Sequence, residues 1–150
     1  MPSKYFTNFG FTGYELTEFH CSHLYLGEIN STVLPKIISS ITDFFEDQEV
    51  PRFIVCFNQP QLFNNRRVLT ASNEDFPKYY QELFTRITRY NASEYNFHPH
   101  VTLKEQDQRK EFTETVDRYV LLEKKEKEIT PIYSKILISV AIPEKTLSSN

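Results

Sequence analysis

Two stretches of the chain carry apolar residues at helical spacing, three and four positions apart. The first is residues 31–48, with Val33, Leu34, Ile37, Ile38, Ile41, Phe44 and Phe45. Ser31 or Thr32 is a suitable N-cap for this helix, and Pro35 is tolerated in a first turn. The second is residues 76–90, with Phe76, Tyr79, Tyr80, Leu83, Ile87 and Tyr90. The pattern predicts an amphipathic helix in each stretch.

Residues 110–128 show a similar but shorter pattern. Phe112, Val116, Tyr119 and Val120 recur at helical spacing, and a highly charged segment follows them. We interpret this stretch as a third helix whose charged end is solvated.

Shorter apolar segments predict β-strands. Residues from His20 to Leu26 alternate, and Gly27 ends the run. Further strands are predicted in residues 52–58, 66–71 and 133–142, and turn signals at Gly10 and Gly13 predict a strand pair within residues 4–16. In the last strand Ile136, Ile138, Val140 and Ile142 share one face, which we expect to close the core.

Length and composition limit the classes of protein that remain. No low-complexity linker divides the 150 residues, so we expect a single domain over 1–150. With three glycines there is neither a GxGxxG nor a Walker A sequence, so side chains or ordinary backbone must hold any bound phosphate. The net charge of −3 argues against a protein that binds duplex nucleic acid, but leaves room for a small nucleotide.

Membrane and disulfide chemistry are also not indicated. No apolar run approaches the roughly 18–20 residues of a membrane span, and the first ten residues lack the apolar region of a signal peptide. Cys21 and Cys56 are isolated and each lies in an apolar run. We expect both to be free, buried thiols in a reducing compartment.

The four histidines lie in two short segments, "HCSHLYLG" from His20 and "HPHVTLKE" from His98. Because side chains alternate along a strand, His20 and Ser22 share a face, and Cys21 and His23 face the opposite way. In the second segment His98, His100 and Thr102 share a face. Both segments thus place a hydroxyl two residues after a histidine.

Three interpretations fit this pattern. The histidines could be half-buried structural residues with hydroxyls bonded to backbone. They could be zinc ligands, although His20 and His23 point to opposite faces of a strand and no carboxylate or cysteine completes the set. Lastly, His20 and His100 could be an acid–base pair for phosphoryl transfer, with each hydroxyl donating to a phosphate oxygen.

The two segments resemble the paired His-x-Thr/Ser motifs, each followed by an apolar residue, of the 2H phosphoesterase superfamily. The resemblance extends from about Phe19 to Ile142. Within the superfamily, residues 57–71, 76–90 and 97–105 are similar in order and spacing to the viral 2',5'-phosphodiesterases. This group includes a coronavirus accessory enzyme, the C-terminal domain of the rotavirus capping protein and a torovirus polyprotein domain. Two departures are Ser22 in place of the commoner Thr, and His23 where the family has an apolar residue.

The resemblance implies an α+β fold with two lobes, in which antiparallel sheets with outer helices surround a central groove. It implies His20 and His100 as catalytic residues and Ser22 and Thr102 as phosphate-binding hydroxyls, with no metal and no cofactor. Arg66 or Arg67 begins the strand before the second helix; we name Arg67 as a substrate-binding candidate. His98 is a candidate rim residue, and Tyr5, Phe6 and Tyr14 are candidates for stacking on adenine.

The implied activity is metal-independent cleavage of 2',5'-linked oligoadenylate, which in the host cytoplasm would remove the activator of RNase L. The implied partner is this substrate or a short RNA or nucleotide, with no duplex nucleic acid and no membrane, and we expect a monomer. Two alternatives remain. One is a 2',3'-cyclic phosphodiesterase acting on RNA ends, and the other is a catalytically inactive nucleotide-binding module.

Overall fold

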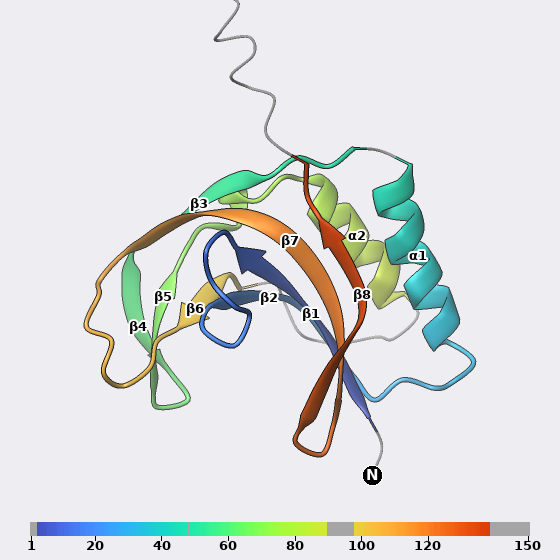
Figure 1. The fold of residues 1–150 in the computed structure, drawn as a ribbon, viewed down its shortest axis with the longest axis horizontal. Helices are drawn as coiled ribbons and strands as arrows, with labels where there is room; N and C mark the ends of the chain where they lie inside the picture. The colour runs from blue at the N-terminus through green and yellow to red at the C-terminus, as the bar shows by residue number, and fades with distance from the viewer. Residues whose placement is uncertain (1–2, 48, 90–97, 139–150) are drawn as a thin grey trace, which may run out of the picture.

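The larger of two antiparallel sheets carries the first motif. The computed structural model describes residues 3–47, 49–89 and 98–138. The strands of this sheet are β1 (Lys4–Phe11), β2 (His20–Gly27), β3 (Phe53–Phe57), β7 (Phe112–Lys125) and β8 (Glu128–Ile136). The order runs β2-β1-β7, and β7 then pairs with β3 along its first part and with β8 along its second part. The long β7 therefore forms the centre of the sheet and curves across the molecule (Figure 1).

The smaller sheet carries the second motif. It consists of β4 (Gln59–Phe63), β5 (Arg66–Thr70) and β6 (His100–Thr102), antiparallel in that order. The turn residues Asn64 and Asn65 join β4 to β5 with φ values of 51° and 64°, as a tight hairpin turn of type I′ requires. In the described part of the chain β2 and β6 are outer strands of different sheets, and they lie in contact with each other.

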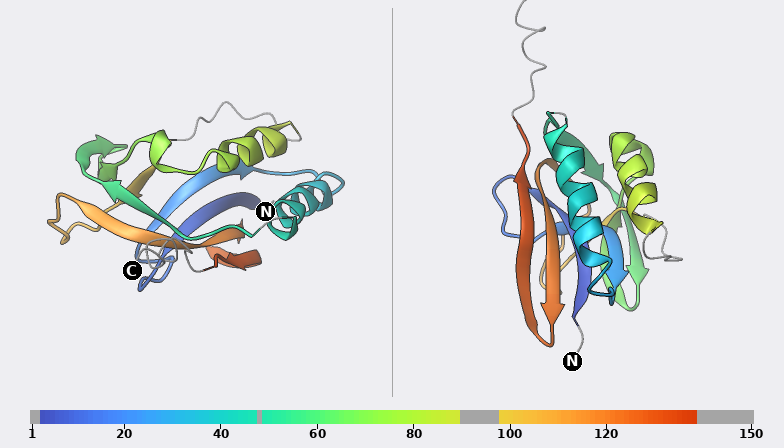
Figure 2. Two further views of the ribbon diagram at one scale, coloured as in Figure 1. Left: turned by 90° about the horizontal axis from the view of Figure 1, so that it is seen from above. Right: turned by 90° about the vertical axis from the view of Figure 1, so that its right-hand side faces the viewer.

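The two helices lie side by side against the larger sheet (Figure 2). They are α1 (Leu34–Glu46) and α2 (Tyr79–Thr88), and a short 3₁₀ helix, η1 (Asn73–Asp75), precedes α2. Phe45 of α1 and Tyr80 of α2 both pack on Tyr119 of β7, with ring centroids 5.2 and 5.8 Å away. Within the described residues, neither helix is long and apolar enough to cross a membrane.

The predicted α+β class, with antiparallel sheets and helices outside them, is confirmed, as are the helices predicted in residues 31–48 and 76–90. One detail of the first helix differs. Val33 is its N-cap, and no side chain caps it, so neither Ser31 nor Thr32 plays that role. Both the amide and the hydroxyl of Thr32 donate to the side chain of Asn30. Pro35 lies in the first turn, where its missing N–H costs nothing.

The third helix predicted in residues 110–128 was wrong, because this segment forms β7. The strand is buried on both faces along its middle, so the four consecutive residues 119–122 are all buried. A strand covered on both faces shows no alternation. Register shifts in β1 at Gly10–Phe11, and at Leu121–Leu122 against β8, further disturb the pattern. The remaining apolar spacing resembled that of a helix.

The predictions for the two ends of the chain need correction as well. The predicted turn at Gly10 is instead part of β1, and the chain turns back only in the loop of residues 12–19. Near the C-terminus, Ile136 and Ile138 are 60% and 38% exposed, whereas Leu137 is buried. The core therefore contacts the face of Leu137, and the prediction that the face of Ile136 and Ile138 closes the core was wrong. Val140 and Ile142 lie outside the described residues.

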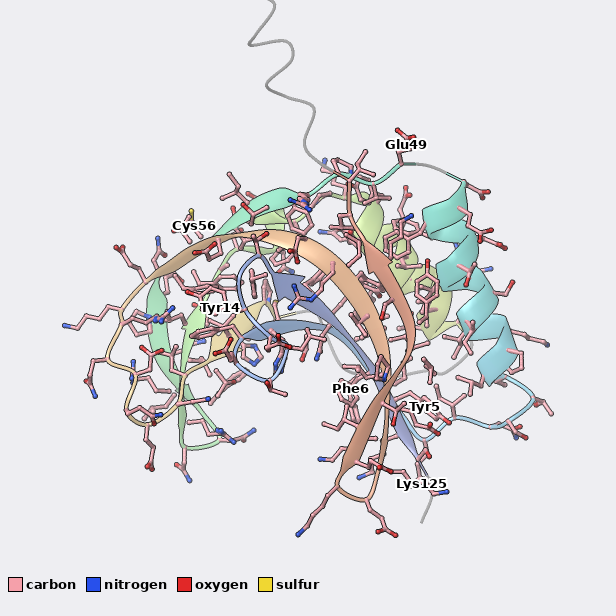
Figure 3. The ribbon with its side chains drawn as sticks, viewed as in Figure 1. Tyr5, Phe6, Tyr14, Glu49, Cys56 and Lys125 are labelled. Carbon is pink, nitrogen blue, oxygen red and sulfur yellow. The ribbon has the colours of Figure 1, made fainter. Side chains whose placement is uncertain are left out.

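The two cysteines occupy different environments. Cys21 is buried as predicted, and burial raises the pKa of its thiol to about 12. Cys56 is exposed on β3, contrary to the prediction, at the outside of the sheet in Figure 3. At neutral pH Cys21 is therefore a protonated, unreactive thiol.

Candidate active site

A bulge at His23 separates His20 and Ser22 of the first motif from the rest of β2. His20 and Ser22 are half-buried, and Cys21 and His23 are buried, as the predicted alternation requires. The register jumps from the pair Asn8 and Ser22 to the pair Thr7 and Leu24, so His23 is the extra residue. A bulge shifts the phase of a strand by one residue. Leu24 and Leu26 are consequently buried and Tyr25 is exposed, whereas the unbroken alternation predicted from His20 to Leu26 would put Leu24 and Leu26 on the face of His20 and Tyr25 on the face of Cys21.

The second motif has the same arrangement on β6. His100 and Thr102 are half-buried on one face, and Val101 between them is fully buried. The two motif strands are in contact, and the thiol of Cys21 lies against the backbone of His100. His20 and His100 are close enough for the charge of one ring to affect the pKa of the other. The fold therefore brings the two histidines and their hydroxyls together from two different sheets.

Backbone carbonyls hold both rings in the same tautomer. Nδ1 of His20 lies 2.9 Å from the carbonyl oxygen of Leu16, and Nδ1 of His100 lies 2.7 Å from that of His98. A carbonyl oxygen can only accept a hydrogen bond, so each Nδ1 carries the proton and donates it. In both neutral rings Nε2 is thus the atom with the free lone pair. Neither Nε2 has a hydrogen-bond partner among the described residues, so both can exchange protons with a substrate.

The pKa of His100 is lowered from that of an ordinary histidine. Burial is the main cause, because it disfavours the charged ring. The positive charges of His98 and His20 lower the pKa of His100 further, and the hydrogen bond to the carbonyl of His98 opposes these effects. The lowered pKa favours the neutral form of His100, which can accept a proton.

His23 has different hydrogen-bond partners and packs in the core. Its Nε2 donates to the carbonyl of Tyr80 at 3.0 Å, and its Nδ1 accepts from the hydroxyl of Tyr119 at 2.7 Å. This is the opposite tautomer to that of His20 and His100. Burial lowers the pKa of His23 to about 3, so the ring is neutral at physiological pH. The position behind the strand agrees with the prediction that His23 faces away from His20.

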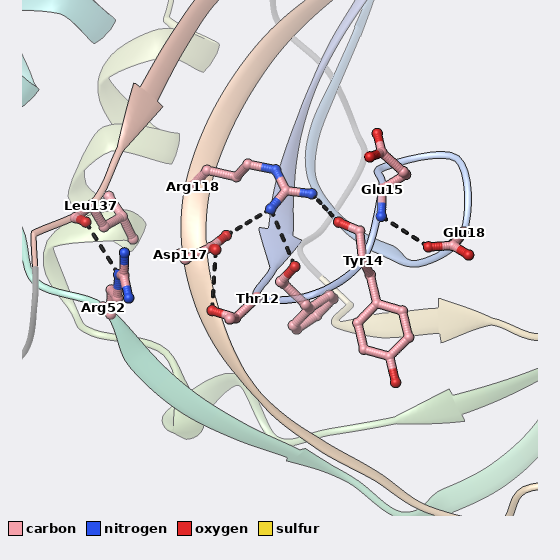
Figure 4. Close-up of polar contacts among 9 residues, drawn as sticks. Thr12, Tyr14, Glu15, Glu18, Arg52, Asp117, Arg118 and Leu137 are labelled. Carbon is pink, nitrogen blue, oxygen red and sulfur yellow. Dashed lines mark hydrogen bonds and ion pairs between the residues drawn. The ribbon is translucent and has the colours of Figure 1, made fainter.

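The loop of residues 12–19 positions His20, because Leu16 in this loop holds the ring. Arg118 of β7 donates to the carbonyls of Phe11 and Tyr14 and to the carboxylate of Asp117. The hydroxyl of Thr12 donates to the same carboxylate at 3.1 Å (Figure 4). The loop that orients His20 is therefore tied to the central strand by several polar contacts.

An aromatic cluster closes the end of this loop. Phe19, which immediately precedes His20, stacks on Phe112 with ring centroids 4.7 Å apart. The guanidinium of Arg109 lies 4.5 Å above the Phe19 ring and pairs with Asp107 at 3.1 Å. The ring of Tyr14 meets Phe19 edge-on at 4.8 Å. These contacts fix the start of β2.

Arg67 lies on the face of the smaller sheet opposite to His100 and Thr102. Its neighbour Val68 pairs with Thr102 and shares the motif face, so Arg67 shares its face with Leu69 and Val101. One guanidinium nitrogen of Arg67 donates to the carbonyl of Arg109 at 3.1 Å. The position of Arg67 therefore separates it from a phosphate held between the two histidines.

Three residues near the site were not predicted from the sequence to belong to it. They are Phe63, whose ring contacts His100, and the pair Gly10 and Arg118 beside His20. The "FNNR" sequence of the β4–β5 turn is a hairpin signal that would have paired Phe63 with Arg66, but it does not indicate that β6 lies beside β5.

Among the aromatic candidates, Tyr14 lies in the loop beside the site, whereas Tyr5 and Phe6 lie at the far end of β1 (Figure 3). The hydroxyl of Tyr5 donates to Glu123 at 3.0 Å. Tyr5 and Phe6 pair with the far end of β2, so of these three residues only Tyr14 lies near His20.

The described residues contain no group of three or more His, Cys, Asp or Glu side chains placed to hold a metal ion. His20 and His23 lie on opposite sides of β2, so these two histidines cannot bind the same zinc ion. His98 is exposed, and its ring packs on Phe63.

No protein-family model matches the sequence, and no curated protein matches it either. Solved structures do match the fold. LigT of Escherichia coli, crystallised with 3'-AMP, superposes with a TM-score of 0.59 at 15% identity, over 91% of this chain and 99% of that chain. TT0787 of Thermus thermophilus gives a TM-score of 0.61 at 16% identity, over 89% and 97% of the two chains.

A third structure, described as a phosphoesterase, gives a TM-score of 0.60 at 14% identity and covers 91% of this chain and 99% of its own. The likeness extends over nearly the whole length of each chain, while identity is too low to carry residue roles. The chain therefore has the 2H phosphoesterase fold, in which two antiparallel sheets and two helices bring His20 and His100 together.

Proposed function

We propose that this protein is a metal-independent phosphodiesterase that uses His20 and His100 as an acid–base pair. The observation that carries the proposal is the matched state of the two rings. Both donate Nδ1–H to a backbone carbonyl, both leave Nε2 free, and each has a hydroxyl two residues along the same strand face. The LigT structures with 3'-AMP and ATP support a nucleotide as the ligand of this fold.

The lowered pKa of His100 suits it to the role of base. In the proposed reaction its Nε2 takes the proton from the ribose hydroxyl next to the scissile phosphodiester. The hydroxyl oxygen then bonds to phosphorus, and the bond from phosphorus to the leaving oxygen breaks. His20 in its protonated form gives its Nε2 proton to that leaving oxygen. The products are a 2',3'-cyclic phosphate and a free 5'-hydroxyl.

Ser22 and Thr102 have the roles of phosphate-binding hydroxyls. Each shares a strand face with its histidine and donates to a non-bridging oxygen of the phosphate, where negative charge increases in the transition state. With one hydroxyl from each sheet, the phosphorus would be held between the two imidazoles. This placement suits attack and departure on opposite sides of phosphorus.

The substrate that we propose is 2',5'-linked oligoadenylate, and its cleavage would antagonise RNase L in the host cytoplasm. The support is the resemblance of residues 57–105 to the viral 2',5'-phosphodiesterases in order and spacing. The net charge of −3 suits a short, flexible nucleotide better than a duplex. The protein would act as a monomer, because both histidines come from one chain.

A second candidate is hydrolysis of 2',3'-cyclic phosphates at RNA ends, with water as the nucleophile. The observation that favours it is the likeness in fold to LigT, which was crystallised with a nucleotide phosphorylated at the 3' position. The same two rings would serve, with His100 activating water instead of a ribose hydroxyl.

One substrate panel separates these candidates. The protein is incubated with 2',5'-linked triadenylate, 3',5'-linked triadenylate and 2',3'-cyclic AMP, and the products are resolved by chromatography. Rapid cleavage of the 2',5' linkage alone supports the proposed substrate. Cleavage of the cyclic nucleotide alone supports the second candidate. Absence of cleavage in all three, with nucleotide binding retained, would favour an inactive binding module.

A further inference from the structure

The face of the smaller sheet that carries His100 also carries an exposed aromatic ring and an exposed cation. Phe63 ends β4 and pairs with Arg66 of β5, and Val68, two residues further along β5, pairs with Thr102. Residues that pair across strands share a face, as do residues two apart along a strand. Phe63 and Arg66 therefore lie on the same face as His100 and Thr102.

The ring contacts agree with this register. The Phe63 ring lies 4.9 Å from the His100 ring in an edge-to-face arrangement, and 5.1 Å from the His98 ring at a shallower angle of 34°. Phe63 is 37% exposed, and His98 is exposed as well. Three rings thus form a continuous shelf that begins at the proposed base and extends toward solvent.

The β4–β5 hairpin determines the face of the smaller sheet on which the Phe63 ring lies. Asn64 and Asn65 form a tight turn of fixed geometry, and Phe63 is held by its pairing with Arg66 immediately before that turn. Exposed aromatic rings on a rigid element are the surfaces on which unpaired nucleobases stack.

Arg66 adds a charge at the end of the shelf. It is exposed, and it forms no salt bridge within the described ranges 3–47, 49–89 and 98–138. Arg66 is two residues from Val68 along β5, so it lies roughly 7 Å beyond the Thr102 row. A guanidinium at that distance can reach a phosphate other than the one held by Ser22 and Thr102.

We propose that Phe63 and His98 form a stacking site for the base of the nucleotide on the His100 side of the cleaved bond, and that Arg66 binds the next phosphate along the strand. This inference rests on the proposed function and specifies its substrate. The ligand is a single-stranded oligonucleotide of at least three units, read by one stacked base and one further phosphate. The larger sheet would hold the nucleotide on the other side of the bond.

The first test uses Phe63→Leu and Phe63→Tyr with a 2',5'-linked diadenylate and two analogues, each lacking one of its two bases. Stacking predicts that Phe63→Leu raises KM for the intact dinucleotide about 5- to 150-fold. It also predicts that the variant no longer discriminates against one of the analogues, whereas Phe63→Tyr restores both properties. A fall in kcat with KM unchanged, and no change in discrimination, would overturn the proposal, because Phe63 would then only support the ring of His100.

The second test uses Arg66→Ala, with Lys125→Ala as the matched control. Lys125 is an exposed cation at the tip of the β7–β8 hairpin, away from the smaller sheet (Figure 3). The ratio of kcat/KM for triadenylate to that for diadenylate should fall about tenfold in Arg66→Ala and stay unchanged in Lys125→Ala. The slope of log affinity against log salt should decrease by about one. An unchanged ratio in Arg66→Ala would refute the role of this residue.

A binding measurement distinguishes failure of this inference from failure of the proposed function. Fluorescence anisotropy with labelled triadenylate is measured on the His20→Ala protein, with and without Phe63→Leu. Weaker binding caused by Phe63→Leu supports the stacking site even if the wild-type protein cleaves none of the substrates. Equal binding by the two proteins rejects the site even if the wild-type protein is an active phosphodiesterase.

Discussion

Arg118 lies across Gly10, the residue that pairs with His20 in the larger sheet. A β-carbon at position 10 would lie 2.6 Å from Nε of Arg118 and 2.8 Å from its Cγ and Cζ, so only glycine leaves room for the arginine. From this position the guanidinium reaches the carbonyl of Tyr14, and two residues later the carbonyl of Leu16 holds the ring of His20. The arginine thus acts on the proposed acid through the loop.

Gly10→Ala should therefore impair turnover as well as stability. Displacing Arg118 would release the loop, and misplacing His20 by about 1 Å can cost up to about 100-fold in kcat. Overpacking should lower the free energy of unfolding by about 1–3 kcal/mol. Steady-state kinetics and thermal melts measure the two effects. In the double variant Gly10→Ala/Arg118→Ala the clash is absent, so it should be no worse than Arg118→Ala alone; a worse double variant would count against this contact.

His20→Ala and His100→Ala should each lower kcat/KM by about 100- to 10,000-fold, the usual cost of removing a general acid or base. Ser22→Ala and Thr102→Ala should lose roughly 10- to 1,000-fold, because each removes a donor to developing charge. Circular dichroism and melting temperature verify that each variant is folded. Retention of near-normal activity in a folded His100→Ala protein would exclude the acid–base pair.

His23→Gln should separate stability from catalysis. The ring lies behind β2 and is bonded to Tyr119 and Tyr80, so its loss should cost about 1–3 kcal/mol of stability while kcat changes only a few-fold.

The pKa of His23, about 3, lies below the ordinary value of 6.5, so the unfolded chain binds the proton more readily than the folded protein. Wild-type stability should therefore decrease as the pH falls from about 6.5 toward 3, by at most about 1.4 kcal/mol per unit. Urea unfolding at several pH values should show a smaller decrease in His23→Gln; an equal decrease would mean that His23 does not titrate in this way.

The pH profile of kcat/KM should identify the base. A base must be neutral, so activity should rise with pH through the pKa of His100, and this rise should lie below pH 6.5 because the pKa of His100 is lowered. His98→Ala removes a positive charge that contributes to the lowering, so the rising limb should move to higher pH. If the variant instead shifts only the falling limb, His100 is the acid and His20 the base.

Activity should persist in the presence of EDTA, and the purified protein should carry no stoichiometric zinc. The proposed proton transfers use two imidazoles and two hydroxyls, and they need no Lewis acid. Turnover with and without chelator, together with metal analysis, tests this. Loss of activity on chelation that zinc restores would replace the acid–base pair with a metal site.

The motif strands and both helices could be predicted from the sequence because their patterns are local. His20 and Ser22 alternate with Cys21 before the bulge, and the apolar stripe of α1 is regular. The β7 strand could not be recognised, because its two faces are covered by segments far away in the chain. The contact of Phe63 with His100 likewise depends on pairing across the smaller sheet, which no spacing along the chain records.

The division of the motif strands between two sheets has a consequence for how activity arises during folding. β2 is bonded to β1, and β1 is bonded on its other side to β7, which follows the second motif in the chain. The pairing of β2 with β1 is local, but the pairing of β1 with β7 joins segments of high sequence separation, and contacts of this kind form slowly. The contact of β2 with β6, which brings the two motifs together, also joins segments that are far apart in the chain. Catalytic activity should consequently appear only with the last cooperative step of refolding, and a partly folded chain would have both histidines but no site.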